Sequence, residues 1–337
     1  WHDTNVNGRQ DAGEAPVPGV TVTLTDGDGN EVATAVTDAA GKYLFDGLVP
    51  GDYTVTFSDL PAGYSVTETN AAGTTAANNS NGLVSTKVSL AAGETDLTFD
   101  LGIYRPASVG DFVWNDTDHD GIQDAGEDGV PGVTVTLTDG SGNVVATTTT
   151  DTDGAYLFDD LVPGTYTVTF SDVPAGFTLS PTNAGSNTAV DSNGLTTTVT
   201  LTEGQHVPTI DLGIFEVASL GDYVWIDADF DGIQDSGEAP VPGVTVTLTN
   251  AGGTVATAVT DADGKYLFTN LVPGDYTVTF SNLPAGYVVT TTGAGSDTAV
   301  DSNGLVSTKT NLDAGEVDLT YDLGIWQPAA LGDFVWH

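Results

Sequence analysis

The chain has 337 residues, 39% of them hydrophobic, which is enough to build several packed domains. It carries 47 Asp and Glu against 6 Lys and Arg, a formal net charge of -41, and this charge disfavours binding to nucleic acid or to anionic membranes. Without cysteine, disulfides, thiolate catalysis and zinc-thiolate sites are excluded. Cations are the expected partners, and no apolar run approaches the roughly 20 residues that membrane insertion needs.

One unit recurs three times along the chain. Each copy contains, in the same order, "PGVTVTLT", "YLF", "LVPG", "YTVTFS", "PAG", "NGL" and "DLGI". Such self-similarity is the signature of a repeat architecture. The expected domains are 1–104 (a repeat without its first strand), 107–215 and 218–326, followed by 329–337 as the first strand of a further repeat. The chain is therefore expected to be a piece of a longer array.

Each repeat begins with an acidic loop that follows the expected strand "GDFVW". With Asp116 as position 1, acids stand at positions 1, 3, 5, 9 and 12 and a glycine at 6, which is the spacing of an EF-hand calcium loop. In such a loop, position 7 contributes a backbone carbonyl and the glutamate at 12 closes the site. The candidate ligands are Asp116, Asp118, Asp120, Ile122, Asp124 and Glu127 in the second repeat, Asp227, Asp229, Asp231, Ile233, Asp235 and Glu238 in the third, and Asp3, Asn5, Asn7, Arg9, Asp11 and Glu14 in the first.

The alternative interpretation of these loops is the solvated surface of a very acidic protein. Recurrence in register, with the glycine and the glutamate included, favours calcium. Two carboxamides in the first loop predict weaker binding there. Strands, not helices, flank each loop, so we expect a structural clamp and not a calcium sensor.

The next elements in each repeat are predicted strands and turns. In "VTVTLT", Val20, Val22 and Leu24 alternate with threonines, which indicates a half-buried strand. Pro-Gly, Asp-Gly and Asn-Gly pairs punctuate the strands at the spacing of a sandwich. Each repeat is therefore predicted to be an all-β, immunoglobulin-like antiparallel sandwich of about seven strands.

A second acidic cluster lies in the motif "TDTDGAYLF" and its counterparts. Asp38, Asp151, Asp153, Asp261 and Asp263 are further candidate metal ligands, and the alternative is an ordinary Asp-Gly turn. Ala40 replaces the second acid in the first repeat. Short connections that contain Pro106 or Pro328 follow the repeats, and their lack of Gly/Ser tracts predicts a semi-rigid rod.

The run "GDFVWNDTDHDGIQDAGEDGVPGVTVTL", with "TDTDGAYLFDDLVPGTYTVTF" and "DSNGLTTTVTL", resembles the B-type repeat of staphylococcal serine-aspartate repeat surface adhesins. The resemblance covers all three units. It implies a calcium-binding fold related to prealbumin-like collagen-adhesin B modules, arranged as a stalk. It also implies that the acids of the EF-like loops are calcium ligands, with Asp151 and Asp153 as members of further sites.

Catalysis is not expected, because no nucleophile-base arrangement recurs beside His2, His119, His206 or His337. The leading hypothesis is a Ca²⁺-stabilised structural repeat of an extracellular surface stalk, adhesin or secreted fibre. Its expected partners are neighbouring repeats of the same chain and, in a fibre, identical chains. The alternatives are an adhesion module that binds host or cell-surface ligands directly, and a filament subunit linked by donation of the "LGDFVWH" strand.

Overall fold

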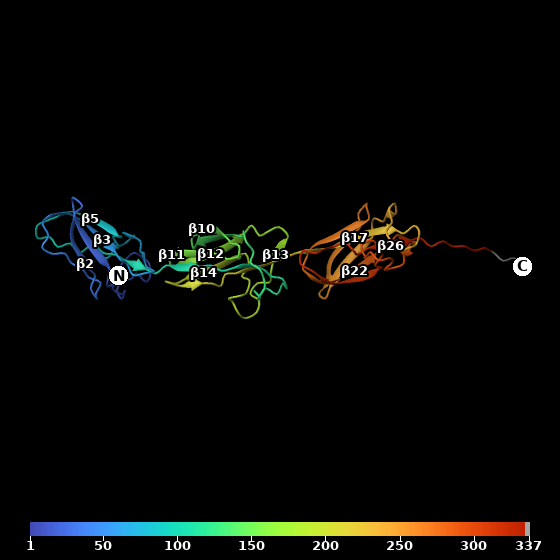
Figure 1. The fold of residues 1–337 in the computed structure, drawn as a ribbon, viewed down its shortest axis with the longest axis horizontal. Coiled ribbons are helices and arrows are strands. Elements are labelled where there is room, and N and C mark those ends of the chain that lie inside the picture. The colour runs from blue at the N-terminus through green and yellow to red at the C-terminus, as the bar shows by residue number, and fades with distance from the viewer. Residues whose placement is uncertain (334–337) are drawn as a thin grey trace. The chain divides into compact units, whose positions relative to one another are not determined.

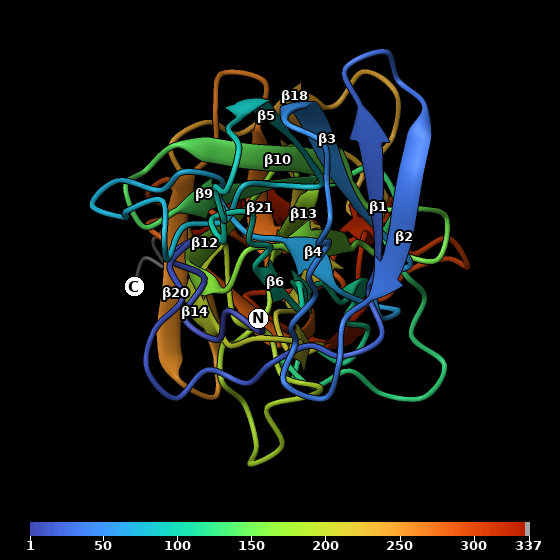
Figure 2. The ribbon, with the colours of Figure 1, turned by 90° about the vertical axis from the view of Figure 1, so that its left-hand side faces the viewer.

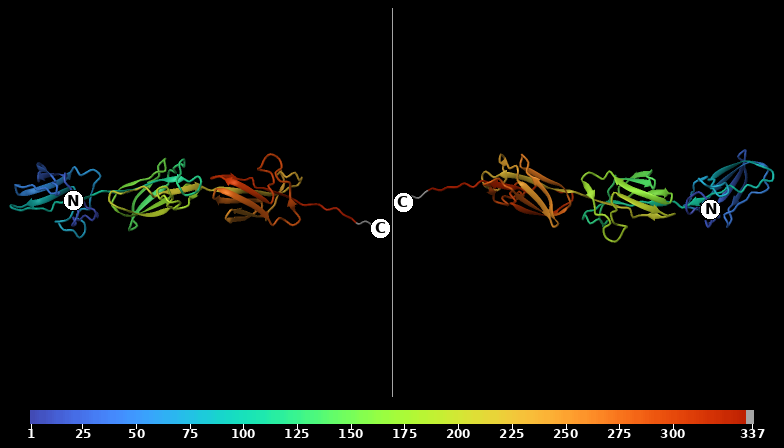
Figure 3. Two further views of the ribbon diagram at one scale, coloured as in Figure 1. Left: turned by 90° about the horizontal axis from the view of Figure 1, so that it is seen from below. Right: turned by 180° about the vertical axis from the view of Figure 1, so that it is seen from behind.

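The computed structural model describes residues 1–333, and every regular element in this range is a strand (Figure 3). This part of the chain contains no helix long and apolar enough to cross a membrane. By its internal contacts the chain divides into two compact units. The first comprises residues 1–113, 129–172 and 187–211, and the second comprises 114–128, 173–186 and the chain from Leu212 onward.

Most strands are labelled in Figures 1 and 2. The first repeat contains β1 (Thr21–Asp26), β2 (Glu31–Val36), β3 (Gly51–Ser58), β4 (Ser65–Val66), β5 (Val84–Leu90) and β6 (Ile103–Tyr104). The second contains β7 (Ala107–Val109), β8 (Val113–Asn115), β9 (Thr134–Asp139), β10 (Val144–Thr149), β11 (Phe158–Leu161), β12 (Gly164–Ser171), β13 (Phe177–Leu179), β14 (Thr196–Leu201), β15 (His206–Val207) and β16 (Leu212–Glu216). The third contains β17 (Ala218–Ile226), β18 (Ala239–Pro240), β19 (Thr245–Asn250), β20 (Gly253–Val259), β21 (Lys265–Leu271), β22 (Gly274–Ser281), β23 (Val288–Val289), β24 (Val306–Leu312), β25 (Val317–Asp318) and β26 (Leu323–Trp326).

The third repeat is a two-sheet sandwich. One sheet has the order β20-β19-β22-β24, and the other has the order β18-β17-β26-β23 with β21 and β25 also paired to β17. Val246 and Phe280 from the first sheet share one buried core with Leu220, Phe268 and Ile325 from the second. Besides the two-residue strands β18, β23 and β25, this repeat has seven strands, as the sequence predicts. The all-β sandwich expectation is confirmed.

The four-stranded sheet recurs in the other repeats as β2-β1-β3-β5 and β10-β9-β12-β14. Its strand β1 is the predicted "TVTLT" segment, and Figure 2 shows it beside its antiparallel neighbour β2. Val22 and Leu24 are buried there, whereas Thr21 and Thr23 are half-buried. The period-2 pattern therefore reports correctly which face packs on the core.

The first and last strands of the third repeat, β17 and β26, lie side by side and run parallel, with Val224 opposite Leu323. This pairing places Asp227, the residue that follows β17, next to β26, the last strand of the repeat. Of the expected further strand at 329–337, residues 329–333 form no strand, and residues 334–337 lie outside the described residues.

Candidate metal centre

The acidic loop of the third repeat begins at Asp227, directly after β17. Its backbone N–H donates to the carbonyl oxygen of Ile325 on β26 at 2.9 Å, and its side chain is fully buried. Oδ1 accepts a hydrogen bond from the N–H of Phe230 at 2.7 Å. Oδ2 accepts from the N–H of Gly232 at 3.0 Å and from the hydroxyl of Thr290. The first acid of the loop is thus fixed to both terminal strands and to its own turn.

The remaining acids of this loop converge on one another. Asp227, Asp229 and Glu238 each offer a carboxylate oxygen, and these three oxygens lie within 4.8 Å of one another. Asp229, Asp231 and Asp235 form a second such group. Because Asp229 belongs to both groups, five carboxylates gather around one loop. Their mutual repulsion makes this a place where a cation is stabilising.

Backbone N–H groups hold two of these acids in place. Glu238 accepts from Ala228 N at 2.7 Å through Oε1 and from Asp235 N at 2.9 Å through Oε2. Asp231 accepts from Ile233 N at 2.8 Å. Glu238 therefore ties the beginning of the loop to its end, as the closing glutamate of a calcium loop does.

The glycine at position 6 is required by the backbone. Gly232 has φ of 80°, and a Cβ added there would overlap the carbonyl oxygen of Thr291. Gly121 also has φ of 80°, and its added Cβ would overlap the carbonyl oxygen of Pro181. The left-handed turn and the close backbone approach both exclude a side chain.

The loop of the second repeat repeats this arrangement. Asp116, Asp118 and Glu127 form one group of oxygens within 4.8 Å, and Asp118, Asp120 and Asp124 form the other. Asp116 is fully buried: Oδ2 accepts from Gly121 N at 2.9 Å, whereas Oδ1 has no hydrogen-bond partner. A buried, unpaired carboxylate oxygen beside other carboxylates fits a hard cation with oxygen ligands, such as Ca²⁺ or Mg²⁺.

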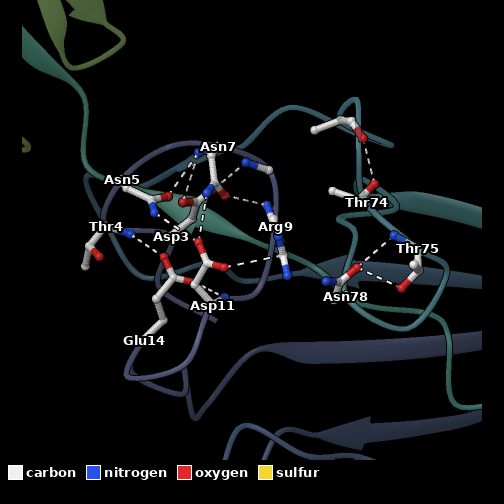
Figure 4. Close-up of polar contacts among 12 residues, drawn as sticks. Asp3, Thr4, Asn5, Asn7, Arg9, Asp11, Glu14, Thr74, Thr75 and Asn78 are labelled. Atoms are coloured by element: carbon white, nitrogen blue, oxygen red, sulfur yellow. Dashed lines mark hydrogen bonds and ion pairs between the residues drawn. The ribbon is translucent and has the colours of Figure 1, made fainter.

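The loop of the first repeat differs (Figure 4). The side-chain amides of Asn5 and Asn7 donate to Asp11 Oδ2 at 3.1 and 2.8 Å, and Arg9 Nε lies 3.4 Å from Asp11 Oδ1. The hydrogen bonds from Asn5 and Asn7, and the charge of Arg9, lower the pKa of Asp11. Glu14 closes this loop as in the others, accepting from Thr4 N and Asp11 N. The negative charge of Asp11 in the first loop is therefore already partly compensated by Asn5, Asn7 and Arg9.

The second acidic cluster forms a turn in each repeat. Asp261 Oδ1 accepts from the N–H groups of Asp263 and Lys265, both at 2.9 Å. Asp151 and Asp38 accept from their own turns in the same way. This is the geometry of the ordinary Asp-Gly turn. Among the described residues no acid of this cluster joins a group of three, so its role as ligand stays a prediction.

One contributor to the site was missed by the sequence analysis. The hydroxyl of Thr290 donates to Asp227, and that of Thr67 donates to Asp3 at 2.6 Å. Ser180 occupies the same place in the second repeat, and its hydroxyl has no partner. A hydroxyl residue at one place in all three repeats was the available signal, but it is hidden among many other threonines.

The domain-family comparison matches the model described as "SdrD B-like domain" to residues 1–103, 107–214 and 218–325. The chain belongs to this family, which confirms the resemblance seen in the sequence. It is a family of structural surface repeats and not of enzymes, in agreement with the expectation drawn from the histidines.

Among curated proteins, the chain is 47% identical over 343 residues to "Serine-aspartate repeat-containing protein D" of Staphylococcus aureus (strain Newman), covering all of this chain and 26% of that protein. It is 42% identical over 348 residues to "Serine-aspartate repeat-containing protein F" of Staphylococcus epidermidis, covering all of this chain and 20% of that protein. The chain thus spans about a quarter or less of the length of these relatives.

Solved structures similar to this chain include BcpA, the major pilin subunit of Bacillus cereus, and the Bacillus anthracis TIE protein. BcpA is 14% identical with a TM-score of 0.35, over 93% of this chain and 96% of that one. The TIE protein is 18% identical with a TM-score of 0.32, over 94% of this chain and 49% of that one.

Proposed function

We propose that the three repeats are structural modules of an extracellular surface stalk or fibre, and that calcium bound at their acidic loops stabilises them. Membership of the SdrD B-like family supports the structural role. The relatives named serine-aspartate repeat-containing proteins contain this array as about a quarter or less of their length, which suits a spacer that presents other regions. The absence of cysteine leaves metal as an available cross-link for an extracellular module.

The observation that carries the calcium proposal is the convergence of five carboxylates in each of the second and third loops. Calcium takes six to eight oxygen ligands, and these loops offer carboxylates with backbone carbonyls between them. When bound, the ion supplies positive charge that offsets the repulsion among the acids. Extracellular calcium sites typically bind at about 0.1 to 1 mM, which matches partly exposed loops of this kind.

The residues of the loop determine what such an ion would stabilise. Asp227 is bonded through its backbone to β26 and through its side chain to Thr290. Glu238 stands just before β18 and bonds back to Ala228. Holding these two acids together therefore fixes the loop against both terminal strands of the module.

This location suits a module that carries tension. Force on a chain of modules enters at the first strand and leaves at the last, and β17 and β26 are adjacent and parallel. Pulling the start of β17 away from the end of β26 loads all the hydrogen bonds between the two strands in shear at the same time, so they do not break one after another. A clamp at the end of β17 then resists extension of the whole repeat.

Binding is tested by calcium titration of the full chain by calorimetry. Asp118 and Asp229 each belong to both acid groups of their loops, so Asp118→Asn with Asp229→Asn should remove the two strongest sites. The matched control is Asp159→Asn with Asp172→Asn, which changes the same charge at exposed acids outside the loops. Equal calcium uptake by all three proteins would rule out the loops as the sites.

A further inference from the structure

A pair of aspartates, one buried and one half-buried, lies outside the acidic loops in each of the second and third repeats. In the third repeat, Asp222 is on β17 and Asp322 immediately precedes β26, which pairs with β17 so that Val224 lies opposite Leu323, and the two carboxyl groups act on each other electrostatically. In the second repeat, Asp111 and Asp211 form the corresponding pair. Asp322 is 0% exposed and Asp211 is 1% exposed. Both pairs therefore join the segment of the first strand to that of the last.

Most of the oxygens of these carboxyl groups have no hydrogen-bond donor within bonding geometry. Both oxygens of Asp322, both of Asp211, and Oδ2 of Asp111 are buried without a hydrogen-bond partner. An unpaired buried carboxylate is expensive, and two in contact are more so. A hydrogen bond between two carboxyl groups requires a proton on one of them, because ionised carboxylates only accept.

The surroundings do not supply a compensating positive charge at Asp322. The groups that face this pair are Asp301, Asp318, the phenol of Tyr266, the backbone N–H of Tyr223, and Lys265, which acts on Asp222. Lys265 is exposed, and Asp318 is already paired with Lys309 at 3.0 Å. In the second repeat the facing groups are Asp191, the phenol of Tyr156, the backbone N–H of Phe112, and His206, which acts on Asp111.

Burial, and then the neighbouring carboxyl group, raises the pKa of Asp322 to about 9, and the same causes raise that of Asp211 to about 9. Burial also raises the pKa of Asp222 and of Asp111. At neutral pH Asp322 and Asp211 then keep a proton, as expected where two neighbouring carboxyl groups cannot both ionise.

We propose that Asp222 with Asp322, and Asp111 with Asp211, each share one proton in an O–H···O⁻ bond that ties the first strand of the repeat to the last. The proton is taken from water and returned to it as the pH rises. Asp222 lines an open groove together with Asp261, Lys265 and Leu319, which gives the proton a route to solvent. The bond is separate from the acidic loop and does not depend on calcium.

The bond makes the stability of each module depend on pH. In the unfolded chain both aspartates titrate near 3.9. In the folded chain one of them keeps its proton to a much higher pH, so the unfolded state binds fewer protons between these values. The contribution is full below about pH 3.9 and is lost as the pH rises through the folded value. Because the folded state binds one more proton per pair, each unit of pH increase between these two pKa values lowers the folding equilibrium constant by up to tenfold.

Infrared spectroscopy of the full chain at neutral pH tests the proposal without any variant. Two buried carboxylic acids should give a protonated C=O band that shifts in D₂O. The band should disappear in Asp211→Asn with Asp322→Asn, and persist in Asp159→Asn with Asp172→Asn. A wild-type spectrum without the band at pH 7 would overturn the proposal, whether or not the loops bind calcium.

The pH dependence of unfolding is the second measurement. An asparagine at 211 and 322 is a permanent donor to Asp111 and Asp222, so the strand contact stays while the titrating proton is removed. Between pH 6 and 9, at one fixed calcium concentration, the wild-type unfolding midpoint should fall more steeply than that of the double variant. Identical pH profiles would contradict proton sharing.

Discussion

The hydroxyl of Thr290 donates to the buried carboxylate of Asp227 from a position 63 residues further along the chain. Thr67 makes the same bond to Asp3 in the first repeat. The first acid of each of these loops therefore accepts a hydrogen bond from a residue outside the loop. The remaining acids of the third loop cluster with this fixed carboxylate.

Replacing Thr290 with valine keeps the shape of the side chain and removes the donor. Asp227 Oδ2 then keeps only its bond from Gly232, and the third repeat should lose about 1–3 kcal/mol of stability. Denaturant unfolding measures the loss. The matched control is Thr308→Val on the exposed face of β24, which should change stability little. Equal effects of the two valines would argue against the role of the Thr290 hydroxyl.

Substituting two glycines of the third loop distinguishes the cost of a left-handed backbone from the cost of a steric overlap. Gly237 has φ of 103° with open space around it, so Gly237→Ala should cost only the left-handed conformation, roughly 1–2 kcal/mol. Gly232→Ala adds an overlap with the carbonyl oxygen of Thr291 and should cost clearly more. Unfolding midpoints and calcium titrations of both variants test this. Gly232→Ala matching Gly237→Ala would show that the backbone approach is unimportant.

The first loop should bind calcium more weakly than the other two, because Asn5 and Asn7 replace carboxylates and donate to Asp11. Asn5→Asp with Asn7→Asp adds two negative ligands and removes both donors. We expect calorimetry to show an additional or tighter site in this variant. Asn30→Asp, outside the loop, is the control. An unchanged titration would contradict the link between charge count and affinity.

Lys309 forms ion pairs with Glu316 at 2.6 Å and with Asp318 at 3.0 Å. Strand register places Val199 of the second repeat at the position of Lys309, since each stands opposite a tyrosine of the neighbouring strand. Lys309→Val alone leaves the largely buried Asp318 without its positively charged partner and should destabilise the third repeat by about 1 kcal/mol.

Adding Glu316→Gln and Asp318→Val to Lys309→Val should restore most of that stability, because the second repeat has Gln205 and Val207 near the equivalent place, beside β7. Thermal unfolding of the single and the triple variant makes the comparison. A triple variant less stable than the single one would show that the ion pairs are not exchangeable for apolar packing.

The features that the sequence predicts correctly are local. The Val22 and Leu24 alternation defines a strand face within six residues, and the spacing from Asp227 to Glu238 defines the loop within twelve. Both patterns depend on the backbone period and not on the partner strand. The glycine at position 6 of the same spacing, Gly232 in this loop, is where the structure has the left-handed turn.

The features that the sequence does not predict depend on strand pairing over long separations. Thr290 meets Asp227 because β23 and β17 both pair with β26, and Asp222 lies near Asp322 because β17 and β26 are neighbours in one particular register. A shift of one residue would turn these side chains to the other face. The turn at Asp261 is a different case. Its sequence pattern fits either a metal ligand or an ordinary Asp-Gly turn, and in the structure the Asp261 carboxylate accepts hydrogen bonds from the backbone of its own turn.

The central claim is that calcium at the acidic loops stabilises the modules, and the unfolding midpoint of the full chain with and without calcium tests it most directly. After thorough chelation the midpoint should fall markedly, and calcium in excess should restore it in proportion to the logarithm of its concentration. The variant Asp118→Asn with Asp229→Asn should respond much less, and Asp159→Asn with Asp172→Asn should respond like the wild type. A wild-type midpoint that is indifferent to calcium removal would contradict the account.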